Sequence, residues 1–373
     1  MLAPPWIPVP PPGYGGIELV VSILCDALVR RGVRVTLFAA PGSRSTATVH
    51  EVLPEAHPGE IERCLHEVDH VACALAAVEE AAVAGDGYDL VHDHCGFTLV
   101  AMADRIQIPV VHTLHGPFTP ETAGFYSRHG TKAHLVAISR AQLASAPPGL
   151  PIAGQVPNPI DLQDRPMCRE KDGYLLWIGR LVESKGPHRA VAAARAAGVP
   201  LILAGPVQPG SEAFFRDVVA PLIDGDSVRY IGEVGGERKR RLFARANALL
   251  MPIRWNEPFG MVMVEALASG TPVIAFREGA APEIVQDGVN GFLVDDEQDM
   301  ARAVPRIGEL DPAACRHSAC RFAGDAAAAG YESVYRKVLS GSRSTGIRRP
   351  FPSTFPRRRI LLPGDALADR ARR

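Results

Sequence analysis

The chain has 373 residues, of which 40 are Lys or Arg and 41 are Asp or Glu, so its formal net charge is −1. A balance this close to neutral gives no electrostatic reason to expect a specific nucleic acid or an anionic membrane as partner. The length allows two domains with full hydrophobic cores, and the 35 glycines and 33 prolines are typical of alternating strands, tight turns and helices.

The seven cysteines are scattered along the chain and form no Cys-x-x-Cys pair. This distribution indicates reduced thiols and a cytoplasmic location rather than a disulfide framework. The sequence shows no signal segment at its start and no apolar stretch of the roughly 20 residues that a membrane span needs. We therefore expect a soluble protein. The one contact with a membrane that these observations leave open is a peripheral one.

The first sixteen residues are too rich in proline for regular structure. A helical pattern follows over residues 17–31, and residues 33–39 read as a strand. Gly15 and Gly16 stand directly before the helix, where a backbone without side chains can approach a phosphate closely. The residues alone fit a plain turn equally well.

Two later strands end in histidine. Residues 88–94 form the first, after a long helix over residues 61–84, and end in His92, Asp93 and His94. His92 and His94 could be read as a metal pair, but no third ligand is evident. His115 lies at the carboxyl end of the next strand, where ligands bind in open α/β sheets, although a structural imidazole explains a histidine there as well.

Residues 144–169 are rich in proline and glycine and read as the crossover between domains. Residues 174–180 then form a buried strand that ends in Arg180, and Lys185 follows before a helix. On such a loop two cations can neutralise a diphosphate; the alternative is ordinary surface salt-bridging. The basic helix at residues 237–246 reads as a solvated face rather than a nucleic-acid surface.

The most informative stretch is residues 256–275. Pro258 keeps Glu257 out of a helix, so a short helix can begin only near Gly260. Gly270 then ends this helix before an apolar strand. Glu265 lies inside the helix, about 8 Å further along its axis than Gly260.

This layout suits a nucleotide-diphosphate sugar. The free N–H groups of Phe259, Gly260 and Met261 would meet an anion at the helix N-terminus, and the carboxylates of Glu257 and Glu265 would accept bonds from hydroxyls at either end. The alternative for Glu257 is an ordinary acid favoured by the helix dipole. Glu265 stands in an apolar helix, where an ionised side chain is costly unless it is bonded.

Glu257 and Glu265, with seven residues between them and Pro-Phe-Gly after the first, resemble the signature of glycosyltransferase family 4. This resemblance implies a retaining enzyme of α/β class and GT-B fold: two Rossmann-like domains whose parallel sheets face each other across a cleft, with a C-terminal helix that crosses back to the first domain. It further implies that Glu257 lies against the donor sugar and Glu265 against the nucleotide ribose. Phosphate oxygens would be held by the amides of Phe259, Gly260, Met261 and Val262.

The same resemblance extends to the other candidate residues. The Gly-Gly-x-Glu loop at Gly15 and Gly16 would face the donor diphosphate across the cleft. His115, in a Thr-x-His-Gly sequence, would lie near the transferred sugar and share a catalytic role with Glu257. Arg180 and Lys185 match the Gly-Arg…Lys-Gly pair that contacts the donor phosphates.

Two features depart from the family pattern. The family begins with a full hydrophobic strand at the centre of the first sheet, and only residues 1–3 remain of it here. We expect its loss to leave unpaired strand edges and a cavity, and we favour a truncated reading frame as the explanation. Pro159 replaces a glycine of the family's Asn-Gly-Ile-Asp turn, so a left-handed conformation at this position is not expected.

The predicted organisation is an N-terminal Rossmann-like acceptor domain over residues 1–155 and a donor domain over residues 156–322. A crossover helix over residues 323–340 follows. Residues 341–373 form a tail with nine Arg against two Asp, which we expect to be disordered.

The predicted activity is glycosyl transfer from a UDP-, GDP- or ADP-linked sugar to an unknown acceptor. The resemblance implies that no metal is obligatory, and we expect no cofactor; cations and the helix N-terminus would stabilise the leaving diphosphate. No carboxylate of the first domain is evident as a nucleophile, unlike in retaining glycosidases. The alternatives are an epimerase or phosphorylase on the same fold, and a non-catalytic nucleotide-sugar binder.

Overall fold

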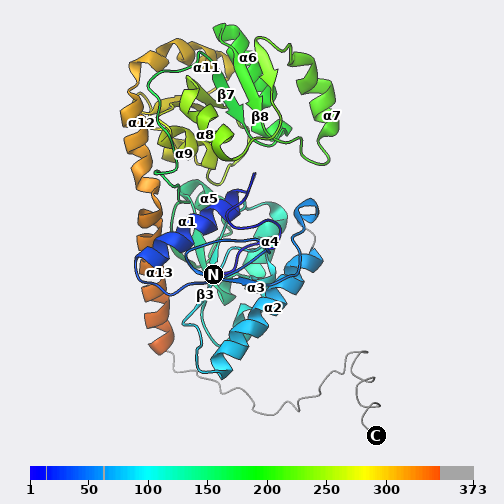
Figure 1. Cartoon of the computed structure of the whole chain (residues 1–373), viewed down its shortest axis with the longest axis vertical. Coiled ribbons are helices and arrows are strands. Elements are labelled where there is room, and N and C mark those ends of the chain that lie inside the picture. The colour runs from blue at the N-terminus through cyan, green and yellow to red at the C-terminus, as the bar shows by residue number, and fades with distance from the viewer. Residues whose placement is uncertain (14, 62–63, 345–373) are drawn as a thin grey trace, which may run out of the picture.

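The computed structural model of the chain describes residues 1–13, 15–61 and 64–344. Two α/β domains lie one above the other along the long axis of the molecule (Figure 1). Strands β1 to β6 belong to the first domain and strands β7 to β12 to the second, and each strand pair is parallel. Among the described residues, none of the helices has both the length and the apolar character that a membrane crossing requires.

The first sheet consists of a pair, β1-β2, and a group of four in the order β3-β4-β5-β6. Its strands are short and apolar at the positions that face the core, as expected where helices cover a parallel sheet. Their bounds are β1 Thr36–Ala39, β2 Thr48–Glu51, β3 Val91–Asp93, β4 Val110–Thr113, β5 His134–Ala137 and β6 Ile152–Gln155.

Leu2 joins these two groups of strands. It forms parallel bridges to Phe38 of β1 and Asp93 of β3. Its N–H donates to the carbonyl of His92 at 2.8 Å, and the N–H of Ala3 donates to the carbonyl of Phe38 at 2.9 Å. Leu2 is 2% exposed and packs into the core. The expectation of unpaired strand edges at this place is therefore wrong, because three residues suffice to hydrogen-bond to both neighbours.

Helices flank the first sheet. The longest is α2. The sequence pattern predicted this helix over residues 61–84, three residues earlier at its start and one residue later at its end than in the structure. The helices of this domain are α1 Gly16–Arg30, α2 Cys64–Val83, α3 Thr98–Met102, α4 Pro120–His129 and α5 Arg140–Ala144.

The second sheet has six strands in the order β12-β11-β10-β7-β8-β9. This is the order of a doubly wound dinucleotide-binding fold, in which the chain returns to the centre of the sheet between its two halves. The strands are β7 Leu175–Ile178, β8 Leu201–Ala204, β9 Val228–Tyr230, β10 Ala248–Met251, β11 Val273–Phe276 and β12 Gly291–Val294.

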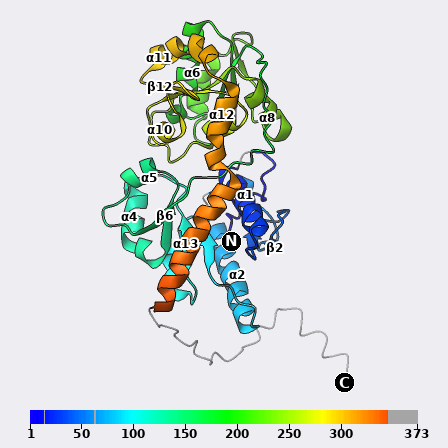
Figure 2. The ribbon, with the colours of Figure 1, turned by 90° about the vertical axis from the view of Figure 1, so that its left-hand side faces the viewer.

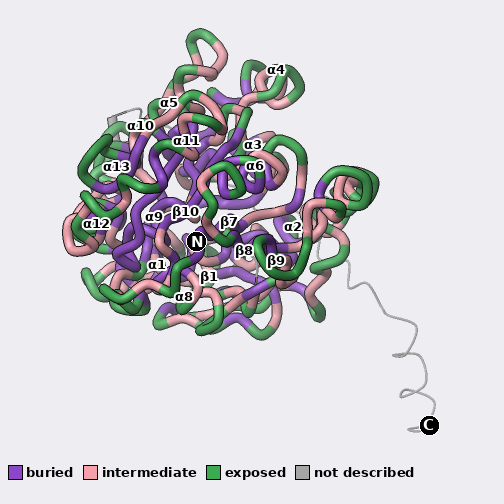
Figure 3. Tube along the Cα trace, turned by 90° about the horizontal axis from the view of Figure 1, so that it is seen from above, coloured by how far each residue is buried: buried purple, intermediate pink, exposed green. Residues whose placement is uncertain are grey.

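Apolar side chains on both faces of the second sheet form two core clusters. Seen from above, the buried segments of the chain gather at the centre and the exposed segments form the rim (Figure 3). The helices named below are α6 Pro187–Ala197, α8 Gly236–Arg245, α9 Met261–Ala268, α10 Ala281–Ile284, α11 Glu297–Ala303 and α12 Pro312–Ala319, and Figure 1 also labels α7 Glu212–Phe214.

The last helix, α13, covers Gly324–Ser344 and runs from the second domain along the first (Figure 2). It packs on α1 and β6, and two ion pairs tie it to α1: Arg30 to Asp325 at 3.1 Å, and Arg31 to Glu332 at 2.5 Å. The crossing back to the first domain is therefore confirmed.

Two boundaries differ from the sequence predictions. Strand β6 lies within residues 144–169, which read as an irregular crossover, because its alternating pattern is short and flanked by prolines. Helix α13 continues to Ser344, four residues past the predicted end at 340. The rest of the predicted disordered tail, residues 345–373, lies outside the described residues.

Candidate active site between the two domains

The donor-side candidates gather at one edge of the second sheet. Strands β7 and β10 are neighbours and parallel, so the loops that follow them leave from the same edge. The loop after β7 carries Arg180 and Lys185, and the loop after β10 carries Glu257. The backbones of these loops meet, since the N–H of Arg254 donates to the carbonyl of Ser184 at 3.0 Å.

Lys185 and Glu257 form an ion pair that the sequence did not predict as a direct contact. Their side chains are 17% and 12% exposed, so the pair is mostly shielded from water. The Lys185 ammonium also lies 4.8 Å from the centre of the Trp255 ring, at cation–π distance. A cation and a carboxylate therefore stand together where the donor phosphates and sugar were predicted.

Helix α9 begins directly after this pair. Gly260 is its N-cap, with φ of 89°, and no side chain caps the helix. Glycine is needed here because the left-handed region is costly for other residues. Phe259 is buried against Phe322, whereas Met261 and Val262 of the first turn are half-buried. An uncapped helix start of this kind offers backbone N–H groups to an anion.

Arg180 lies at the same edge, just after β7. Its side chain is half-buried, and its Nε is buried without a hydrogen-bond partner among the described residues. Buried polar groups are normally bonded, so this guanidinium has capacity to bind an anion.

Glu265 is 1% exposed and is held by two cations. Its Oε1 lies 2.7 Å from Nη2 of Arg165 and 2.9 Å from Nζ of Lys239. Burial raises the pKa of Glu265, but Lys239 and Arg165 outweigh burial, so the pKa lies below its usual value. The apolar surroundings of Glu265 in the sequence predicted that it must be bonded, but both of its partners are distant along the chain and were not predicted.

On the side of the first domain, the loop before α1 reaches the second domain. A Cβ added to Gly235, after β9, would lie 2.9 Å from the carbonyl oxygen of Pro12. Gly15 is buried, and a Cβ there would lie 2.6 Å from Pro11, so only glycine fits. Gly16 is exposed and opens α1. The structure thus places the loop that precedes α1 at the domain boundary, and contact of Gly15 and Gly16 with the donor stays a prediction.

His115 lies just after β4, and its Nε2 is 2.9 Å from Nδ1 of His94, which follows β3. His92 is bonded through both ring nitrogens, to the hydroxyls of Tyr335 at 2.6 Å and Thr113 at 2.8 Å. Both nitrogens of His92 are thus occupied by hydroxyls, which leaves none for a shared metal with His94. The first-domain candidate for contact with the sugar remains His115.

His112 lies inside β4. It is 1% exposed, and its Nδ1 lies 2.7 Å from the carboxylate of Asp93.

The described part of the chain contains one group of three side chains that could hold a metal ion: His57, Glu60 and His66. Glu60 and His66 already form an ion pair, and the rings of His57 and His66 stack with centroids 3.9 Å apart.

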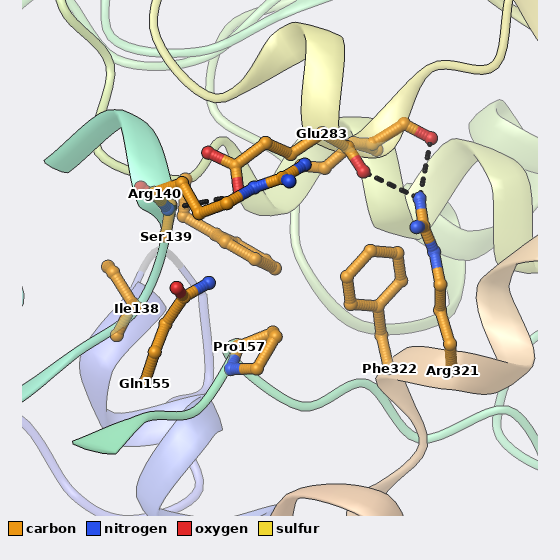
Figure 4. A pocket seen from close by; sticks show the side chains of 10 residues that line it. Ile138, Ser139, Arg140, Gln155, Pro157, Glu283, Arg321 and Phe322 are labelled. Carbon is orange, nitrogen blue, oxygen red and sulfur yellow. Dashed lines mark hydrogen bonds and ion pairs between the residues drawn. The ribbon is translucent and has the colours of Figure 1, made fainter. Parts of the chain in front are cut away.

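A pocket of about 280 Å³ lies between the domains (Figure 4). Of the predicted site residues only Phe259 lines it, so it adjoins the site rather than containing it. Its lining residues are Ile138, Ser139, Arg140, Gln155, Pro157, Phe259, Glu283, Ile284, Arg321 and Phe322.

Glu283 at the rim of this pocket links the two domains. Its carboxylate accepts the N–H of Arg140 at 3.0 Å and that of Ala141 at 2.7 Å, at the start of α5. A further bond crosses the boundary from Asn256 to Ser145 at 3.0 Å. The edge that carries the donor-side residues therefore faces the carboxyl edge of the first sheet.

Family models match most of the chain. The model described as Glycosyltransferase Family 4 matches residues 14–163, and the model described as Glycosyl transferases group 1 matches residues 162–316. A curated D-inositol 3-phosphate glycosyltransferase from Nocardioides sp. is 31% identical, over 80% of this chain and 78% of that protein.

Among solved structures, AviGT4, a glycosyltransferase involved in avilamycin A biosynthesis, is 30% identical with a TM-score of 0.68, over 91% of this chain and 97% of that one. Anabaena HepE in complex with UDP-glucose is 20% identical with a TM-score of 0.62, over 92% of this chain and 98% of that one, and shows the shared fold. The chain therefore belongs to glycosyltransferase family 4 and is a glycosyltransferase of GT-B fold.

Proposed function

We propose that this enzyme transfers a sugar from a nucleotide-diphosphate donor to an acceptor hydroxyl, with retention of the anomeric configuration. The observation that carries the proposal is the Lys185–Glu257 pair, which stands directly before the uncapped start of α9. A cation, a carboxylate and free amides at one edge match the charges and hydroxyls of a sugar diphosphate.

The pair acts by exchange of partners. Without ligand, Lys185 and Glu257 neutralise each other. When a diphosphate binds, Lys185 turns to the phosphate, together with Arg180 and the amides of Met261 and Val262. Glu257 is then left to accept a hydrogen bond from a sugar hydroxyl. Stabilisation of the departing diphosphate is the main catalytic contribution of these groups.

Glu265 receives the ribose in this proposal. Because Lys239 and Arg165 keep its carboxylate ionised, it is a strong acceptor for ribose hydroxyls. HepE, which shares the fold, has been solved with UDP-glucose, so UDP is the first nucleotide to test.

The buried acids of the first domain support a retaining reaction in which the enzyme supplies no nucleophile. In its described part, the two buried acids are Glu18 and Asp93. Asp93 accepts hydrogen bonds from His112 and from the N–H of Cys95. Burial raises the pKa of Glu18 to about 7. The Asp93 carboxylate is already hydrogen-bonded inside the domain, and the buried Glu18 holds a proton more readily than an ordinary glutamate, so we propose attack by the acceptor on the same face that the diphosphate leaves.

Lys185, Arg180 and the helix start supply the positive charge that the reaction needs, so we propose that it runs without a cofactor or an obligatory metal. The seven cysteines are all free thiols, which supports a cytoplasmic site of action. The curated relatives named for D-inositol 3-phosphate make a phosphorylated polyol the first acceptor to try.

Nucleotide release tests the proposal. The enzyme is incubated with UDP-, GDP- and ADP-linked hexoses, with and without D-inositol 3-phosphate, and the anomeric signal of the product is read by NMR. We expect acceptor-dependent release from one donor, with the donor's anomeric configuration kept. Release without any acceptor would indicate epimerisation or hydrolysis instead, and an inverted product would refute retention.

A further inference from the structure

His94 and His115 form a hydrogen-bonded pair of imidazoles at the carboxyl edge of the first sheet. His94 Nδ1 and His115 Nε2 are 2.9 Å apart, and the two rings are inclined by 30° with centroids 5.1 Å apart. His94 is fully buried, whereas His115 is half-buried. The pair therefore reaches from the interior of the domain to the edge that faces the donor side.

Both rings are neutral. Burial, with His92 and His115 nearby, holds the pKa of His94 well below its usual value. Burial and His112 lower the pKa of His115 to about 3. A neutral imidazole carries one N–H and one bare nitrogen, so a single proton lies between the two rings.

Two arrangements of that proton are chemically allowed. In the first, His94 donates from Nδ1, and its own Nε2 is a bare acceptor. In the second, His115 donates from Nε2, and His94 must then carry its proton on Nε2. The choice between them depends on the surroundings of that Nε2 atom.

Nε2 of His94 is buried and has no hydrogen-bond partner among the described residues. The ring of His92 packs against that of His94, with centroids 4.1 Å apart, but both nitrogens of His92 are already bonded to hydroxyls. A buried N–H without an acceptor is rarer and more costly than an under-used acceptor. The surroundings therefore favour the first arrangement, in which His115 keeps its proton on Nδ1.

The backbone at His115 is fixed as well. The amide of Gln142 donates to the carbonyls of Leu114 and Gly116, both at 2.8 Å, on either side of His115. Gln142 is itself 1% exposed and caps the N–H of Ile138. The position of the His115 ring is thus set by Gln142 through the backbone and by His94 through Nε2.

We propose that His94 is a positioning residue that fixes the tautomer of His115, so that His115 presents an Nδ1–H donor to a hydroxyl of the transferred sugar. The part that concerns the sugar rests on the proposed function, whereas the tautomer is a property of the enzyme alone. A donor at this place orients the sugar without changing its own protonation in the neutral pH range.

The tautomer is tested first, by ¹⁵N NMR of histidine-labelled enzyme, with the His115 signals assigned by their loss in His115→Asn. We expect a protonated Nδ1 and an unprotonated Nε2 at His115 between pH 6 and 8. A protonated Nε2 at His115 would overturn the proposal whether or not the enzyme turns over any donor. Absence of turnover with this tautomer present would count against the proposed function alone.

Substitutions test the positioning role. Asparagine places an amide N–H near the position of Nδ1 and can donate to His115, whereas glutamine places it further out. We expect His94→Asn to keep kcat within a few-fold, and His94→Gln and His94→Ala to lower kcat by about tenfold to a hundredfold with little change in KM for the donor. His134→Gln, at the exposed start of β5, is the control and should not change kcat.

Thermal unfolding of each variant separates a loss of positioning from a loss of folding. Equal kcat in His94→Asn, His94→Gln and wild type, at equal stability, would refute the positioning role.

Discussion

Single residues set the geometry of the donor-side loops, and Gly279 is the clearest case. It has φ of +53°, and a Cβ there would lie 2.4 Å from the backbone N of Glu257 and 2.5 Å from its carbonyl oxygen. The N–H of Ala280 donates to that same carbonyl at 3.0 Å. The backbone of Glu257 therefore rests directly on a residue that has no room for a side chain.

Gly279→Ala should displace Glu257 and lower kcat/KM by about tenfold to a hundredfold, because small misplacements of a contacting group are costly in rate. Gly288→Ala is the matched control: its φ is +72°, but nothing lies within 4 Å of the added Cβ. Both variants place an alanine in the left-handed region, which costs about 1–2 kcal/mol of backbone strain. Equal kcat/KM in the two variants would mean that the contact between Gly279 and Glu257 does not contribute to catalysis.

Glu265, the acid that we propose to bind the ribose, also has a structural role. Removing it leaves the buried guanidinium of Arg165 without its counter-charge. We expect Glu265→Ala to destabilise the enzyme by about 3–5 kcal/mol in urea unfolding. The double variant Glu265→Leu/Arg165→Met should recover much of this loss. A double variant that is less stable than Glu265→Ala would contradict the coupling between Glu265 and Arg165. Nucleotide binding by either variant must be measured under conditions in which that variant is folded.

Glu18 makes stability depend on pH. Burial raises its pKa from 4.5 to about 7, so the folded state holds a proton between these values that the unfolded state has lost. Stability should therefore fall as the pH rises through this window, by an amount on the order of 3 kcal/mol.

Glu18→Gln should remove that fall and be the more stable form at pH 8, while at pH 4 it should match wild type. Urea unfolding at pH 4, 6 and 8 measures this, with Glu79→Gln on the exposed face of α2 as the control. If the stability of wild type and of Glu18→Gln changed with pH in the same way, Glu18 would not be the group that causes the pH dependence.

At the scale of elements, α13 is joined to the first sheet through hydroxyl groups. The Tyr335 hydroxyl is 2.6 Å from Nδ1 of His92, and the Tyr331 hydroxyl is 2.8 Å from Oγ1 of Thr113. His92 and Thr113 bond to each other at 2.8 Å, which closes a chain of polar contacts inside the domain. The crossover helix is thereby fixed to β3 and β4, the strands that His94 and His115 follow.

Tyr335→Phe should leave Nδ1 of His92 without a partner and destabilise the enzyme by about 1–3 kcal/mol. Urea unfolding measures the change, and Tyr88→Phe, whose ring packs edge-on against Phe38, is the control. If the two variants had equal stability, the bond to His92 would contribute nothing to the docking of α13.

Regular elements with a clear period could be predicted from the sequence, and elements defined by distant partners could not. Helix α9 begins at Met261, one residue after the predicted start, because Pro258 and Gly260 act locally. The role of Leu2 escaped prediction, since its partners Phe38 and Asp93 lie far along the chain. The partners of Glu265 escaped for the same reason: Arg165 is 100 residues away.

At the scale of the whole molecule, the two sheets face each other along their carboxyl edges. Glu283 holds the start of α5, and Asn256 bonds to Ser145, so the domains are in contact beside the donor-side loops. The arrangement makes the boundary between domains the place where a donor from one side and an acceptor from the other can meet. The proposed reaction requires a nucleotide diphosphate to bind at this boundary through Lys185.

Calorimetric titration of the full chain with UDP, GDP and ADP tests that dependence most directly. We predict that at least one of them binds wild type, that Lys185→Ala weakens this binding by about tenfold or more, and that Lys337→Ala on the exposed face of α13 leaves it unchanged. Failure of all three nucleotides to bind the folded wild-type enzyme, or equal affinity in wild type and Lys185→Ala, would contradict the account.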